Sequence, residues 1–132
     1  MPDAVTTNVQ MNGARNYQAT FTNISDATGE TAVVKISKAA LLNDKGVSPA
    51  RLNIKRVQWS IQGFSSVRIL WDHTTDDVAM TLATGQGFMD FTDTAPLADP
   101  SSAGGTGDVL FTTAGAAVGA TYDITLWVVK AG

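Results

Sequence analysis

Hydrophobic and polar residues alternate with a period of two along much of this chain. The alternation is clearest in residues 57–62 and 67–72, where every second position is apolar. Successive side chains of a β-strand point to opposite faces, so this period predicts strands that bury one face. Residues 63–66 separate the two runs and are predicted to form a turn, and residues 78–82 form a third apolar run. The segment is therefore expected to fold into consecutive antiparallel strands.

Further strands are predicted on both sides of this segment. Residues 16–23 and 31–37 alternate before it, and residues 108–113 and 121–129 alternate after it. A short run of helix-forming residues over 37–42 predicts at most one short helical turn. About seven or eight strands with so little helix indicate an all-β fold, and we expect a jelly-roll-like antiparallel β-sandwich.

The long strand that precedes residue 57 changes phase. Leu52 and Ile54 are apolar at even positions, whereas the run that begins at Val57 is apolar at odd positions. A β-bulge adds one residue to a strand and restores the alternation. We therefore predict a bulge near Lys55 and Arg56.

Two segments lack the strand pattern. Residues 1–15 are polar without sustained alternation, and we expect an N-terminal arm that is either flexible or ordered by a partner. Residues 16–132 would then form a single β-sandwich domain. Residues 83–107 contain several glycines and prolines and are predicted to be mostly loop, with its apolar members packed over a sheet edge or a neighbour. So long a connection in a compact domain is usually functional.

Composition narrows the classes of function. The 132 residues fit one domain, and they are 44% hydrophobic but only 16% charged, against the ~25% charged residues of typical soluble proteins. Burial of some faces in an assembly explains such a weakly charged surface. A net charge of −3 argues against a general nucleic-acid partner, and the absence of cysteine excludes disulfides and thiolate chemistry.

The sequence also shows neither a membrane-spanning segment nor a secretory signal. No apolar run approaches the ~18 residues of a membrane-spanning helix, so no membrane partner is expected. The first residues lack the basic and apolar regions of a secretory signal. We therefore expect synthesis in a cytoplasm.

One cluster has the residue types of a metal site. Asp72, His73, Asp76 and Asp77 lie within six residues, although their spacing is not that of an EF-hand loop and a second histidine is absent. Aspartate and threonine also satisfy backbone groups in loops between strands, which is the interpretation we favour. We predict no metal and no cofactor.

Catalytic chemistry finds little support in the chain. A serine triad would have to use His73, and no Gly-x-Ser-x-Gly motif accompanies it. Acids are present, but nothing in the sequence brings two of them to the ~5–9 Å that glycoside hydrolysis needs. We predict no catalytic residue, and hence no enzyme.

Aromatic residues offer a second type of site. Trp59, Trp71 and Trp127 could form an aromatic platform for a sugar. Trp59 shares the apolar phase of its strand and is predicted to lie in the core. Trp127 lies on the face opposite the apolar residues of its strand, so we predict that it contacts a partner.

Basic residues supply the remaining interface candidates. Arg51, Lys55 and Arg56 lie close together in the sequence. We interpret them as a solvated strand flank or a contact to an acidic protein, in preference to a phosphate site. Arg15, at the end of the arm, is a further interface candidate. The predicted interface residues are therefore Trp127, Arg15, Arg51, Lys55 and Arg56.

Three segments of the chain resemble small virion structural proteins of tailed bacteriophages. They are residues 21–30 (FTNISDATGE), residues 67–77 (VRILWDHTTDD) and residues 99–126, which begin DPSSAGGTGD. The similarity spans roughly residues 20–130 and leaves out the arm. The resemblance implies a capsid decoration (cement) protein, a β-sandwich that trimerises over junctions between capsomers on the virion surface. It would clamp the shell of the major capsid protein against internal DNA pressure.

We therefore expect a structural protein with two kinds of partner, sister subunits in a homotrimer and the phage major capsid protein. Three modest contacts that act together raise avidity by ~10²–10⁴ over a single contact. The alternative from another class is a tail or fibre component or a carbohydrate-binding β-sandwich module.

Overall fold

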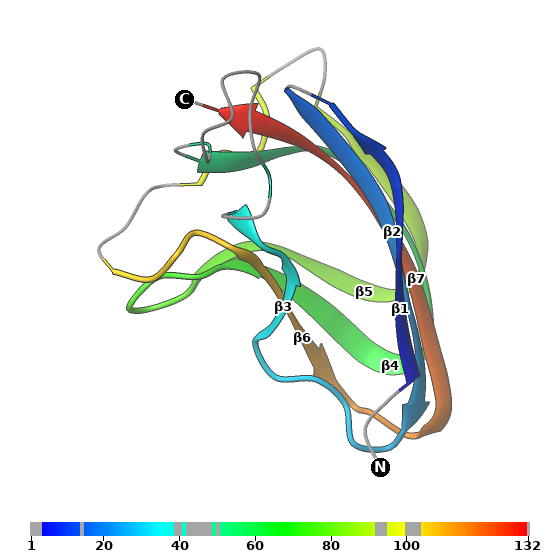
Figure 1. The fold of residues 1–132 in the computed structure, drawn as a ribbon. Helices are drawn as coiled ribbons and strands as arrows, with labels where there is room; N and C mark the ends of the chain where they lie inside the picture. The colour runs from blue at the N-terminus through cyan, green and yellow to red at the C-terminus, as the bar shows by residue number, and fades with distance from the viewer. Residues whose placement is uncertain are drawn as a thin grey trace.

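The computed structural model describes residues 4–13, 15–38, 41, 49, 51–91, 95–99 and 104–131. These residues form antiparallel strands and no α-helix, which confirms the all-β prediction (Figure 1). The strands are β1 (Ala4–Asn12), β2 (Asn16–Asp26), β3 (Val33–Ile36), β4 (Arg51–Trp71), β5 (Asp77–Asp90), β6 (Val109–Ala114) and β7 (Val118–Ala131).

One sheet contains all seven strands, in the order β1-β2-β7-β4-β6-β3, with β5 paired to β4 beside this path. The first half of β4 pairs with β7 and its last six residues pair with β6, so β4 belongs to both halves of the sheet. The sheet curls on itself into a nearly closed, barrel-like shape (Figure 1). The finer prediction of a jelly-roll sandwich is not confirmed, because hydrogen bonds join every strand into one sheet.

The segment predicted to be a turn is a bend within β4. Gly63 has a φ of +86°, and a Cβ atom at this position would lie 2.8 Å from the Cβ of Ala120. Glycine is therefore required both by backbone conformation and by space. The register against β5 shifts between Ile61 and Ser66. The prediction of a turn over residues 63–66 was wrong, since the chain continues as one strand of 21 residues.

The predicted bulge is confirmed. The register of β4 against β7 shifts between Ile54 and Arg56. Leu52, Ile54 and Val57 are all fully buried, although they lie at even and odd positions. The extra residue thus keeps apolar side chains on the same face of a long strand.

Two segments that lack an alternating pattern are nevertheless strands. β1 pairs with β2 from Ala4 opposite Ile24 to Asn12 opposite Tyr17, so much of the expected arm is ordered by its own chain. Its side chains are exposed, which explains why no buried face marks it in the sequence. β5 likewise continues to Asp90 through a region predicted to be loop.

Of the apolar residues of that segment, Leu97 lies at a sheet edge, as predicted, whereas Phe88 and Met89 are exposed. Leu97 forms an isolated bridge with Ile54, with N···O distances of 2.8 and 2.9 Å in the two directions, and packs against the core. The helical turn predicted over residues 37–42 falls largely outside the described residues.

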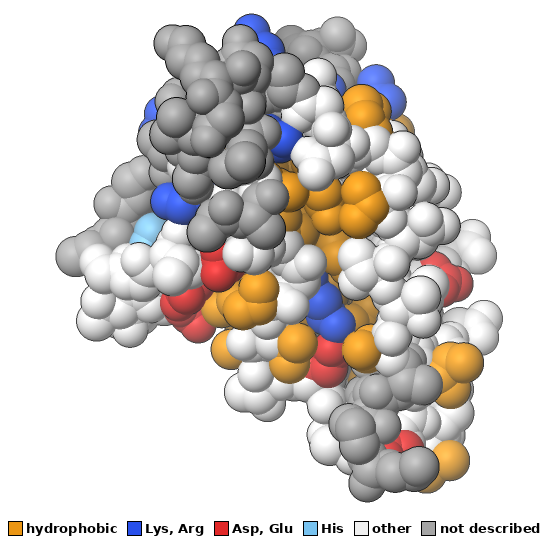
Figure 2. Space-filling view, viewed as in Figure 1, with side chains coloured by type: hydrophobic (Ala, Val, Ile, Leu, Met, Phe, Trp, Pro, Cys, Tyr) orange, Lys and Arg blue, Asp and Glu red, His pale blue; other side chains and the backbone are white. Residues whose placement is uncertain are grey.

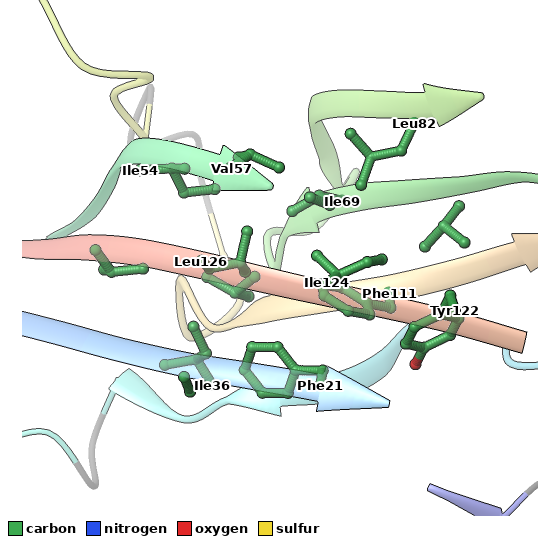
Figure 3. Packing of buried hydrophobic residues seen from close by; sticks show 14 of the residues in the cluster. Phe21, Ile36, Ile54, Val57, Ile69, Leu82, Phe111, Tyr122, Ile124 and Leu126 are labelled. Atoms are coloured by element: carbon green, nitrogen blue, oxygen red, sulfur yellow. The ribbon is translucent and has the colours of Figure 1, made fainter. Parts of the chain in front are cut away.

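The core lies inside the curl of the sheet. Phe21 of β2 meets Phe111 of β6 edge to face across the interior, with ring centroids 5.4 Å apart. Phe111 in turn meets Tyr122 of β7 at 5.8 Å. Figure 3 shows these rings together with Ile124 and Leu126. The two halves of the sheet are therefore held together by apolar packing as well as by the shared strand.

Candidate functional site

The outer face of β7, β4 and β5 carries the side chains that alternate with the core residues. Gln58 of β4 lies opposite Thr125 and Phe88, and Ser60 lies opposite Asp123 and Gln86. With Trp59 and Gly87, these residues line an open groove of about 480 Å³, which we call the outer groove. Its walls contain amide, hydroxyl and carboxylate groups and the ring of Phe88.

Trp127 and Arg56 lie next to each other at one end of the outer groove. They are directly opposite in the β4–β7 register, and the Arg56 guanidinium lies 5.9 Å from the centre of the Trp127 ring. Phe88 stands perpendicular to Trp127, with centroids 6.4 Å apart. The structure thus brings two predicted interface residues together. Sequence reasoning missed Phe88 because it lies in a segment predicted to be loop.

The other three interface candidates lie apart from this pair. Arg15 is exposed between β1 and β2, and its carbonyl accepts a hydrogen bond from the backbone N–H of Lys130 at 2.7 Å. Arg51 is exposed at the start of β4, and Lys55 donates through Nζ to Oδ1 of Asn16 at 3.1 Å. Since Lys55 is bound within the fold and Arg56 lies on an aromatic ring, the basic cluster does not form one unpaired patch.

The predicted aromatic platform of three tryptophans is not formed. Trp71 is in the core, where its Nε1 donates to the carbonyl of Leu52 at 2.9 Å. Trp59 is half-buried and packs against the core, as predicted from its phase. Only Trp127 lies on the outer face of its strand.

Long sheet edges are a further surface feature. Among the described strands, β1 pairs only with β2, and β5 pairs only with β4, so each has an edge with unpaired backbone groups. β1 contains no charged residue, and β5 has charges only at its two ends. Both carry exposed large apolar side chains, namely Val5, Val9 and Met11 on β1 and Val78, Phe88 and Met89 on β5. Figure 2 shows apolar side chains beside Lys, Arg, Asp and Glu side chains on the face in view.

His73 is buried in the connection between β4 and β5 and holds the loop before β6. Its Nε2 lies 2.7 Å from Oδ1 of Asp99, and its Nδ1 lies 3.0 Å from the carbonyl oxygen of Gly104. A carbonyl oxygen only accepts hydrogen bonds, so Nδ1 carries a proton, and Nε2 donates to the Asp99 carboxylate. This arrangement fits an imidazolium.

The surroundings of the ring favour its charged form. Burial alone would lower the pKa of His73, but the hydrogen bonds to Gly104 and Asp99 and the charges of Asp99 and Asp77 outweigh it. The pKa of His73 is therefore raised above its ordinary value. The partners Asp99 and Gly104 are distant in the sequence, which is why the sequence did not reveal them.

The same residues have the spacing of a metal site. Within the part of the chain that the structure describes, His73, Asp77 and Asp99 are the group whose ligand atoms lie within 4.8 Å of one another. However, Nε2 of His73 already donates to Asp99, and Oδ1 of Asp76 accepts from the backbone N–H of His73 at 3.2 Å. These contacts agree with the favoured interpretation of a self-stabilised loop.

No protein-family model, curated protein or solved structure matches this chain. Among the described residues, no helix has the length and apolar character to cross a membrane. The functional proposal therefore depends on the surfaces described above.

Proposed function

We propose that this chain is a capsid decoration (cement) protein of a tailed bacteriophage, which forms a homotrimer and binds the shell of the major capsid protein. The observation that supports the proposal most is the uncharged open edge of β1. In this proposal the two halves of the curled sheet act as the layers of a jelly-roll-like sandwich.

The edge of β1 has the properties of a surface that another chain covers. Natural proteins usually protect open edges with lysine, proline or very short strands. β1 has nine residues and neither lysine nor proline, and a register shift between Val9 and Met11 is its one irregularity. A sister subunit or a capsid strand that pairs along this edge satisfies its backbone groups.

The side chains of β1 add apolar area to this edge. Val5 and Val9 lie opposite the buried Asn23 and Ala19, so they face the same side as the core but remain about half exposed. Burial of apolar surface contributes roughly 25 cal/mol per Å². A modest contact per subunit becomes strong when three subunits bind one shell together.

Deletion of residues 1–11 tests this role. The deletion retains Asn12 and Gly13, whose oxygens accept hydrogen bonds from Nζ of Lys130 at 2.7 and 2.6 Å. Because β1 side chains are exposed, the core should remain folded, as checked by circular dichroism. We expect the full chain to sediment as a trimer and to cosediment with empty heads assembled from the phage's own major capsid protein. The deletion variant should lose most of this occupancy.

Two point variants of β1 distinguish its faces. Val9→Lys places a charge on the core-facing side, whereas Asn8→Lys places the same charge opposite Thr20 on the outer side. We expect Val9→Lys to reduce shell occupancy about ten-fold and Asn8→Lys to leave it nearly unchanged. A full-length chain that is monomeric and absent from the heads would contradict the proposal.

A further inference from the structure

The outer groove brings together polar groups from three adjacent strands. Gln58 and Ser60 of β4 form its centre, with Gln86 of β5 and Asp123 of β7 on the two sides. In the described part of the chain, these four side chains form no hydrogen bond with another protein group. Their donors and acceptors are therefore available to a ligand. Amide, hydroxyl and carboxylate groups in one shallow site are suited to ligands that carry many hydroxyls.

The ring of Phe88 lines the groove, and the ring of Trp127 borders it. Phe88 is 54% exposed and stands perpendicular to Trp127, so the two rings form a corner at the groove wall. On the core-facing side of the sheet, behind the groove, the ring of Trp59 lies directly against Gly87, where a Cβ atom would be 2.1 Å from Cζ2 of the ring. Gly87 is thus required for this close approach. The apolar faces of pyranose rings bind to exposed aromatic faces, while their hydroxyls need polar partners beside the ring.

The charges at the groove select among ligands. Asp123 is the one charged residue that lines it, and it is exposed. The neighbouring Arg56 lies against the Trp127 ring, and its Nε is 3.4 Å from Oδ2 of Asp90. An anionic ligand would therefore meet an uncompensated carboxylate, whereas a sugar hydroxyl can donate to it.

We propose that the outer groove is a binding site for a neutral saccharide. Phe88 and Trp127 supply the stacking surface, and Gln58, Gln86 and Asp123 bind the hydroxyls. The site lies on β4, β5 and β7, and the proposal does not depend on capsid binding through β1. A chain fixed to a shell by β1 would add a saccharide contact to the virion.

Titration of the isotope-labelled full chain tests the site. The neutral probes are maltotriose, cellotriose and triacetylchitotriose, and the anionic probe is 3′-sialyllactose, each followed by amide NMR shifts. At least one neutral probe should give saturable shifts at residues of the groove, with a Kd of about 1 mM or tighter. If no neutral probe shifts groove residues, or if sialyllactose binds best, the proposal is wrong.

Neighbouring residues of β5 provide a matched pair of variants. Phe88→Ala removes the stacking ring, whereas Met89→Ala removes a residue of similar exposure, 42%, that lies opposite the buried Val57. We expect Phe88→Ala to weaken binding about five-fold or more, the equivalent of roughly 1 kcal/mol, and Met89→Ala to leave it unchanged. Equal effects of the two variants would overturn the assignment of the groove.

Discussion

The two faces of β7 and β4 differ in what they contact. On the inner face, Tyr122, Ile124 and Leu126 are fully buried against the opposite half of the sheet. On the outer face, the alternate residues Asp123 and Trp127 line or border an open groove. The inward-facing side chains of one strand therefore stabilise the fold, and the outward-facing side chains of the same strand are available for binding. Variants of one face should leave the property of the other nearly intact.

A buried ion pair packs against the inner face. Nζ of Lys35 lies 2.5 Å from Oε2 of Glu30, and the hydroxyl of Tyr122 donates to Oε1 of Glu30 at 2.5 Å. Both charged side chains are only 5% exposed, and Lys35 also lies 5.8 Å from the Phe111 ring. Its outer counterpart is the pair of Arg56 and Asp90, which is more than one-third exposed on both sides.

Glu30→Ala should give the largest loss of stability. It leaves the Lys35 ammonium buried without its carboxylate, which costs about 3–5 kcal/mol. Urea unfolding followed by circular dichroism measures the change. Asp90→Ala is the matched control, with an expected cost of about 0–1 kcal/mol because exposed ion pairs are screened by water. Similar losses of unfolding free energy in the two variants would show that the buried ion pair is no more important for stability than the exposed one.

Leu126→Ala tests the apolar part of the inner face. Removal of a fully buried leucine side chain leaves a cavity and should lower the free energy of unfolding by about 2–5 kcal/mol. Asp123→Ala, on the outer face of the same strand, should change it by no more than about 0.5 kcal/mol. The same urea experiment compares the two variants. In saccharide titrations of the folded proteins, Asp123→Ala should weaken binding more than Leu126→Ala does.

The His73 contact should produce a smaller, pH-dependent effect. Because the folded-state pKa of His73 is raised, its stabilisation is fully present below the unfolded pKa, about 6.5. It is lost as the pH rises through the folded-state pKa. Unfolding midpoints of the wild type should therefore fall over this range relative to those of His73→Gln. A constant difference between the two proteins from pH 6 to pH 9 would show that His73 does not titrate against Asp99.

The strands that the sequence predicted best are those with one buried face. Residues 121–129 alternate because Ile124 and Leu126 meet the core while Thr125 does not. The bulge near Arg56 was also predictable, since burial on one face imposes a phase that the sequence must keep.

The segments that the sequence did not predict depend on contacts with distant residues. β1 buries no face and is fixed by its ladder with β2. Gly87 is tolerated within β5 because the Trp59 ring covers it, and Gly63 bends a strand because Ala120 lies beside it. Trp127 could be assigned to an outer face from its strand alone, but its proximity to Phe88 depends on the register of β4 against both neighbours.

The position of β4 has a mechanical consequence. Its hydrogen bonds reach β7, β5 and β6, so every path through the sheet from β1 to β3 passes along it. Tension applied at the β1 edge is transmitted through β2 and β7 into this strand and then divided between two further ladders. Separation of the two halves of the sheet therefore requires that a ladder of β4 be broken.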